Sequence, residues 1–97
     1  MLLAVALMVT ACSVTKPAED ATGEELYANL CENCHSADLS GRIGPDIGPG
    51  SPSATEPDEF LEFTIMNGRG RMPSFSSSLD ETQLERLVGY IREVQDR

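Results

Sequence analysis

The sequence predicts a small all-α domain of three to four helices. Two segments begin with a complete helix-start signal, and the C-terminal segment repeats apolar residues at helical spacing. No segment alternates apolar and polar residues as a half-buried strand does, and no internal repeat occurs. At 97 residues the chain has room for one domain.

The composition indicates that the core is completed by something other than side chains. The chain has three Phe, two Tyr and no Trp. Small domains with such a modest core often need a covalent, metal or cofactor staple. The balance of 16 acidic against 7 basic residues, a net charge of −9, disfavours nucleic-acid binding because phosphates repel it. No stretch approaches the roughly 20 apolar residues of a transmembrane helix.

The first residues are typical of an export signal. Residues 2–9 are almost wholly apolar, and Val9-Thr10-Ala11-Cys12 resembles the bacterial lipobox, in which the Cys is lipidated and becomes the mature N-terminus. We therefore expect a signal peptide over residues 1–11, a lipid on Cys12 and a flexible tether over residues 12–21. An ordinary cleaved signal with Cys12 as a bystander is the alternative. The expected location is outside the cytoplasm, anchored by lipid to the membrane surface, in the periplasm or on the outer face of the cell membrane.

The domain proper is expected over residues 22–97, beginning with a helix. Thr22 and Glu25 have the Thr-x-x-Glu spacing of a capping box. The helix runs directly into residues 31–35. Its apolar face is formed by Leu26, Tyr27 and Leu30.

The middle of the chain is predicted to be mostly irregular. Residues 38–57 contain so many Gly and Pro that we expect no regular structure there. A structureless loop of this length in a compact domain needs a reason, such as wrapping a ligand. Residues 57–66 then predict a short helix, which Asn67-Gly68 ends.

The last helix has the clearest signals. Asp80 and Gln83 form a variant of the capping box, and Leu79 and Leu84 occupy the staple positions around it. Gly89 interrupts this helix, and we expect it to permit close packing against the first helix. The apolar stripe consists of Leu84, Leu87, Val88, Ile91 and Val94.

The pattern Cys31-x-x-Cys34-His35 is the signature of c-type haem attachment. Two thiols at this spacing form thioethers with the two vinyl groups of haem, and the adjacent His35 then faces the iron. Three alternatives fit less well. A zinc site usually needs four Cys or His ligands, but His35 is the only His and Cys12 the only other Cys. A thioredoxin-like redox pair lies near a βαβ pattern, which is absent, and a structural disulfide leaves His35 unexplained.

The second axial ligand of the iron is expected to be Met72. With a single His, bis-His ligation within the chain is excluded, and Met is the natural alternative. Met1 and Met8 lie in the signal. Met66 lies in a predicted helix, where a Met more often fills the core. Met72 instead follows a flexible Gly-Arg-Gly-Arg segment and precedes Pro73, which keeps the chain extended.

With these motifs in the same order, residues 22–97 resemble class I cytochromes c, specifically the small lipid-anchored bacterial mono-haem type. The matching segments are LYANLCENCH, SGRIGPDIG, IMNGRGRMPSF and LERLVGYIREV. The resemblance implies a small cytochrome c fold, with three to four helices wrapped around one covalently bound haem c. It also implies that His35 and Met72 ligate the iron.

The resemblance assigns further roles to matching positions. Pro45 is implied to offer its backbone carbonyl to His35 Nδ1, which sets the tautomer and strengthens the bond to iron. An ordinary turn proline is the alternative. The first and last helices are implied to cross near Gly23 and Gly89. The chain lacks the Trp that some relatives place beside a haem propionate, so the partners of the propionates are open.

Three arginines, Arg42, Arg69 and Arg71, flank the segments expected to contact haem in an otherwise acidic chain. They either pair with the propionates or form a positive rim around the exposed haem edge. Solvated loop arginines are the alternative.

These inferences predict a monomeric electron carrier that is not an enzyme. Two axial ligands leave no open position on the iron, so chemistry on a substrate is not expected. The expected partners are membrane electron-transfer complexes, such as a quinol-oxidising complex and a terminal oxidase or reductase, met through small transient contacts. The alternatives are a haem-based sensor or weak peroxidase with a labile Met72, or a haem subunit of a larger membrane complex.

Overall fold

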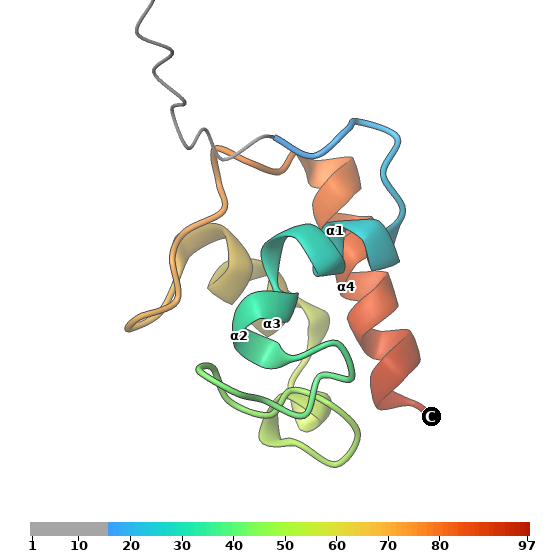
Figure 1. Ribbon diagram of the computed structural model, residues 1–97, viewed down its shortest axis with the longest axis vertical. Coiled ribbons are helices and arrows are strands. Elements are labelled where there is room, and N and C mark those ends of the chain that lie inside the picture. The colour runs from blue at the N-terminus through green and yellow to red at the C-terminus, as the bar shows by residue number, and fades with distance from the viewer. Residues whose placement is uncertain (1–15) are drawn as a thin grey trace, which may run out of the picture.

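The computed structural model describes residues 16–97, which fold into a small group of helices joined by loops (Figure 1). In these residues no strand forms beyond one isolated bridge between Arg69 and Met72. The prediction of an all-α fold is confirmed. The elements in chain order are α1 (Gly23–Leu30), α2 (Glu32–His35), a 3-10 helix η1 (Pro52–Thr55), α3 (Asp58–Asn67) and α4 (Glu81–Gln95).

The expected signal over residues 1–11 and the expected lipid on Cys12 lie outside the described residues. From residue 16 onwards, no helix combines the length and hydropathy that crossing a bilayer requires.

The chain is held against α4 earlier than expected, before residue 22. Gln83 Nε2 donates to the Ala18 carbonyl at 3.2 Å, and Arg86 Nη1 donates to the Glu19 carbonyl at 2.8 Å. These side chains of α4 satisfy backbone carbonyls in a segment that we had expected to be a free tether.

α1 and α4 begin where their capping boxes predict. The Thr22 hydroxyl accepts the Glu25 amide at 3.1 Å, and the Asp80 carboxylate accepts the Gln83 amide at 2.7 Å. In both boxes the third residue of the helix also reaches back to the capping residue. Each box satisfies amides that a helix start otherwise leaves unpaired.

α1 crosses α4 at Gly23, and the two helices are the most closely associated pair of the fold (Figure 1). A Cβ on Gly23 would lie 2.2 Å from the Arg86 carbonyl oxygen and 2.8 Å from Tyr90 Cβ, so no larger residue fits there. Gly89 behaves differently: it is exposed, and an added Cβ would meet nothing within 4 Å. The expectation that Gly89 permits close packing against the first helix is therefore wrong, although the crossing does lie near it. α4 meets Gly23 through Arg86 and Tyr90, one turn apart, and Gly89 lies in open space.

The expectation that nothing regular forms between residues 38 and 57 is also wrong, because η1 lies within this range. Pro52 is its first residue, where a fixed φ suits a short turn of helix and no amide is missed. The first helix leads directly into residues 31–35 as expected: α1 ends at Leu30, and Cys31 lies between it and the short α2. The buried apolar core comes from α1, α3, α4 and the loops between them. Its members are Ala21, Leu26, Tyr27, Cys31, Leu39, Leu61, Ile65, Leu79, Leu84, Leu87, Val88, Ile91 and Val94.

Candidate functional site

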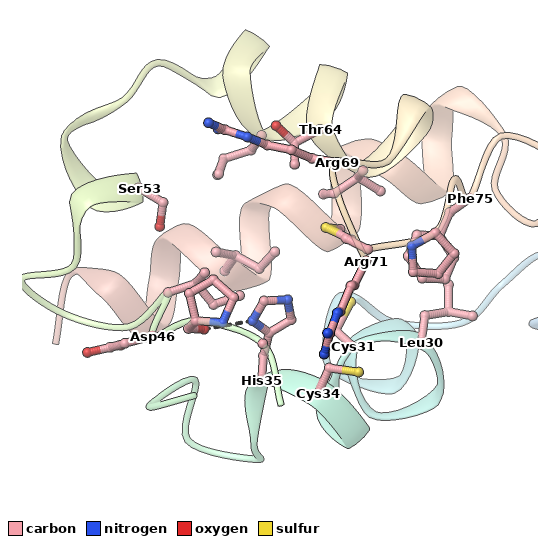
Figure 2. A pocket seen from close by; sticks show the side chains of 18 of the residues that line it. Leu30, Cys31, Cys34, His35, Asp46, Ser53, Thr64, Arg69, Arg71 and Phe75 are labelled. Carbon is pink, nitrogen blue, oxygen red and sulfur yellow. Dashed lines mark hydrogen bonds between the residues drawn. The ribbon is translucent and has the colours of Figure 1, made fainter. Parts of the chain in front are cut away.

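A cavity of about 710 Å³ lies between the α1–α2 segment, α3 and the loops that flank α3. Figure 2 shows Cys31, Cys34 and His35 along one side of it, with Thr64 and Arg69 across from them. Apolar side chains make up most of the lining: Leu30, Ile43, Pro45, Ile47, Pro52, Phe60, Leu61, Ile65, Met72, Pro73, Phe75 and Ile91.

His35 is the last residue of α2 and is buried, with 7% of its surface exposed. Its Nδ1 lies 2.8 Å from the carbonyl oxygen of Pro45, as Figure 2 shows by a dashed line. A carbonyl only accepts, so Nδ1 carries the proton and donates. This tautomer leaves Nε2 as the ring atom with a free lone pair. The hydrogen bond that the resemblance implied for Pro45 is therefore present.

Gly44 determines how the His35 ring lies. A Cβ at Gly44 would stand 2.9 Å from His35 Cε1, 3.1 Å from Nδ1 and 3.2 Å from Nε2. The Gly44 amide also donates to the Cys34 carbonyl at 2.7 Å, which fixes this stretch of backbone against α2. The absence of a side chain at residue 44 thus lets the backbone pack directly on the imidazole.

The two cysteines differ in environment, although both line the cavity. Cys31 is buried between α1 and α2, and Cys34 is exposed. Burial, and to a smaller extent the neighbouring Cys34, raises the pKa of the Cys31 thiol to about 12. Cys31 is therefore a neutral thiol at physiological pH, unless its sulfur is covalently bonded. Within residues 16–97 neither cysteine forms a disulfide.

Met72 reaches the cavity from a tight turn that follows α3. The Arg69 amide donates to the Met72 carbonyl at 3.1 Å, and the Met72 amide donates to the Arg69 carbonyl at 2.9 Å. Gly70 has a φ of +57° at the tip of this turn. We had expected a flexible segment, but these paired hydrogen bonds close it into a defined structure.

Contacts with the end of α3 hold the Met72 segment further. A Cβ on Gly68, whose φ is +77°, would lie 2.6 Å from the Met72 carbonyl oxygen, so only Gly lets the chain pass here. Beyond the turn, the Phe75 amide donates to the Ile65 carbonyl at 3.0 Å. The position of Met72 is therefore set by α3 on both sides of it.

The structure separates the two candidate methionines. Met72 lines the cavity, whereas Met66 lies in α3, packs partly buried against the core and is not among the lining residues. Two of the three flanking arginines, Arg69 and Arg71, line the cavity, and Arg42 does not. The Arg69 guanidinium also lies over the Phe60 ring, 5.9 Å from its centre.

These residues fit a covalently bound haem. The cavity is large and mainly apolar, and it brings together the two thiols, a His with its Nδ1 already bonded, and a Met sulfur. Elsewhere in residues 16–97 no group of three or more His, Cys, Asp or Glu is placed to hold a metal ion.

Sequence reasoning did not single out the contact between Gly44 and the His35 ring. The signal available was the position of Gly44 immediately before Pro45, but a glycine beside a proline usually indicates only a turn.

Comparison with known proteins supports this picture. Residues 18–91 match the family model described as cytochrome C oxidase, cbb3-type, subunit III. The dihydro-heme d1 dehydrogenase of Pseudomonas aeruginosa is 35% identical over 82 residues, which are 82% of this chain but only 16% of that protein. Cytochrome c6 of Euglena viridis is 32% identical over 80 residues, covering 72% of this chain and 86% of the relative. The crystal structure of cytochrome cL from Hyphomicrobium denitrificans matches with a TM-score of 0.68 and 31% identity, covering 75% of this chain and 45% of that one.

Proposed function

This chain belongs to the c-type cytochromes, electron carriers with covalently bound haem c, and on that premise we propose that it is an extracytoplasmic mono-haem electron carrier. Cys31 and Cys34 would hold one haem in the cavity through thioether bonds. His35 Nε2 and the Met72 sulfur would bind its iron. The observation that carries this proposal is that Met72 lines the same cavity as His35, whereas Met66 does not.

Each residue of the cavity has a physical role in this function. The bound haem supplies an iron that exchanges one electron between its ferrous and ferric forms. The Pro45 carbonyl holds the proton on His35 Nδ1 and so keeps Nε2 directed at the iron. Gly68 and the turn at Gly70 fix the backbone that carries Met72, which would limit rearrangement during electron exchange. The apolar lining excludes water from the site.

The location and partners belong to the same proposal. A signal over residues 1–11 exports the chain, and a lipid on Cys12 anchors it at the membrane surface. Membrane redox complexes donate and accept the electron through transient contacts around the cavity mouth. With His35 and Met72 both bound to it, the iron would have no position left for a substrate, and the proposed role is therefore that of a carrier and not of an enzyme.

A second function is favoured by two findings from the comparisons. The family model is named for an oxidase subunit, and one relative of this chain, a dehydrogenase, is much longer than the matched segment. The chain would then be a fixed haem subunit of a larger membrane complex. Co-purification from detergent-solubilised membranes distinguishes the two: a carrier separates from its partners in salt, whereas a subunit remains in fixed stoichiometry.

The primary test is an absorption spectrum of protein matured in a host that attaches haem c, recorded oxidised and reduced. Wild type and Met66→Ala should show the weak long-wavelength band of an iron–sulfur bond, and Met72→Ala should lose it. A high-spin wild-type spectrum without this band would contradict the proposal and favour a sensor or peroxidase with an open iron.

A further inference from the structure

The side chain of Arg92 on α4 forms several hydrogen bonds with the loop that precedes α3. Its Nη1 donates to the Ser53 carbonyl at 3.2 Å, and its Nη2 donates to the Glu56 carbonyl. Its Nε forms an ion pair with Asp58 at 2.7 Å, and Nη1 also donates to Gln95 Oε1 at 2.8 Å. One guanidinium therefore spans the end of η1 and the start of α3, through the planar array of donors that Arg alone provides.

Gln95, one turn further along α4, also binds this loop. Its Nε2 donates to the Ile47 carbonyl at 2.9 Å and to Ser53 Oγ at 3.2 Å. Gln95 is buried, with 8% of its surface exposed, and Arg92 holds its Oε1. Together the two side chains, here called the loop clamp, bind residues 47–58 to a helix far away in the sequence.

The clamped loop is a wall of the cavity. Ile47, Pro52, Ser53 and Glu56 all line it, and η1 is the only regular element within the loop. A loop with so little structure of its own needs outside partners for its carbonyls to keep one conformation. The loop clamp donates hydrogen bonds to three carbonyls of this loop, those of Ile47, Ser53 and Glu56.

We propose that Arg92 and Gln95 are positioning residues that hold the 47–58 loop closed over the haem and thereby raise its reduction potential. This inference rests on the proposed function, since it requires haem in the cavity. A water-excluding wall disfavours the more positively charged ferric haem, so opening the wall lowers the potential. The clamp acts on the wall and not on His35. The stretch that carries Pro45 is held independently, by the Gly44 amide on the Cys34 carbonyl and the Ile47 amide on the Leu39 carbonyl.

The chain offers a matched control on the same helix. Arg86 Nη1 also donates to backbone carbonyls, those of Glu19 and Ala21, but neither residue lines the cavity. Arg92→Gln and Arg86→Gln therefore both remove a positive charge and hydrogen bonds to loop carbonyls from α4, and Arg92→Gln also removes the ion pair with Asp58. Only Arg92→Gln releases the loop that forms the cavity wall. A third variant, Arg92→Lys, keeps the charge but cannot reproduce the forked contacts.

The experiment measures the midpoint potential and amide hydrogen exchange of the haem-loaded proteins. We expect Arg92→Gln and Arg92→Lys to lower the potential and to speed exchange in residues 47–58. Arg86→Gln should keep the wild-type potential and speed exchange only around residues 18–23. Equal shifts in potential for Arg92→Gln and Arg86→Gln would overturn the inference, because the effect would then be general destabilisation or charge. A wild-type potential in Arg92→Lys or in Arg92→Gln would overturn it as well.

The spectrum of the wild-type protein tests the proposed function independently of the variants. If wild type carried no covalent haem, or lacked the iron–sulfur band, the proposed function would fail and this inference with it. If wild type showed both features and the variants left the potential unmoved, only the role of the clamp would be contradicted.

Discussion

The backbone of Gly44 packs directly on the imidazole of His35, so that a Cβ at residue 44 would lie 2.9 Å from the Cε1 atom of the ring. Real Cβ atoms do not approach this closely, so any side chain at residue 44 must displace the ring or the backbone. The ring is also fixed through Nδ1 to the next residue, Pro45. A displaced ring therefore loses either this hydrogen bond or its direction into the cavity.

We predict that Gly44→Ala weakens His35 as an iron ligand. The expected result is a mixed or high-spin spectrum in the matured protein, with thioether attachment through Cys31 and Cys34 retained. Gly89→Ala is the control, since an added methyl there meets nothing within 4 Å. A low-spin Gly44→Ala protein with the wild-type potential would contradict the importance of this contact.

Gly23 and Gly89 should respond in opposite directions to the same substitution. Gly23→Ala forces a methyl against the Arg86 carbonyl, and we expect a loss of stability of about 1–3 kcal/mol from overpacking. Gly89→Ala removes an exposed helix glycine, and we expect a gain of up to about 1 kcal/mol. Chemical denaturation of the two variants measures both. Equal losses would mean that Gly89 also packs against another element.

The stability of the fold should fall at high pH through Tyr27. Burial, together with nearby negative charges, raises the pKa of this phenol above its ordinary value, and its hydroxyl donates to the Ser36 carbonyl. The neutral phenol is therefore favoured in the folded state. Its contribution is complete below the unfolded-state pKa of about 10 and is lost progressively as the pH rises above that value.

Tyr27→Phe isolates this effect. The variant should be less stable than wild type near pH 7, because the Ser36 carbonyl loses its donor. Between pH 9 and roughly pH 11, its stability should decline less steeply than that of wild type. Parallel pH profiles from denaturant titrations would contradict the prediction.

Acylation of Cys12 tests the proposed anchor. Growth with a radioactive fatty acid should label the wild-type protein, and Cys12→Ala should carry no label and should be released from membranes. Cys12 is not part of the Cys31-x-x-Cys34-His35 motif, so the variant should keep the wild-type absorption spectrum. Label that survives Cys12→Ala, or an unlabelled wild type, would rule out a lipid at this residue.

Local signals in the sequence were sufficient for the three longer helices, α1, α3 and α4, but not for the short α2 and η1. The capping boxes at Thr22 and Asp80 are confirmed, because a cap and its helix are formed by residues only a few positions apart. The haem-attachment motif is equally local, with Cys31, Cys34 and His35 in five consecutive positions. The choice of Met72 over Met66 remains a proposal, but the position of Met72 in the cavity agrees with it.

Other features depended on which surfaces meet, and no local signal contains that information. Gly23 and Gly89 look alike in the sequence, yet only Gly23 lies at the helix crossing. Arg92 and Gln95 look like ordinary polar residues near the end of α4, yet they hold a loop more than 30 positions away. The sequence by itself therefore determined the three longer helices and the spacing of the Cys31-x-x-Cys34-His35 motif, since these follow from short-range hydrogen bonding and covalent spacing. Only the tertiary structure decided which glycine is crowded and how the cavity is closed, because packing and long-range hydrogen bonds depend on elements that meet only in the folded chain.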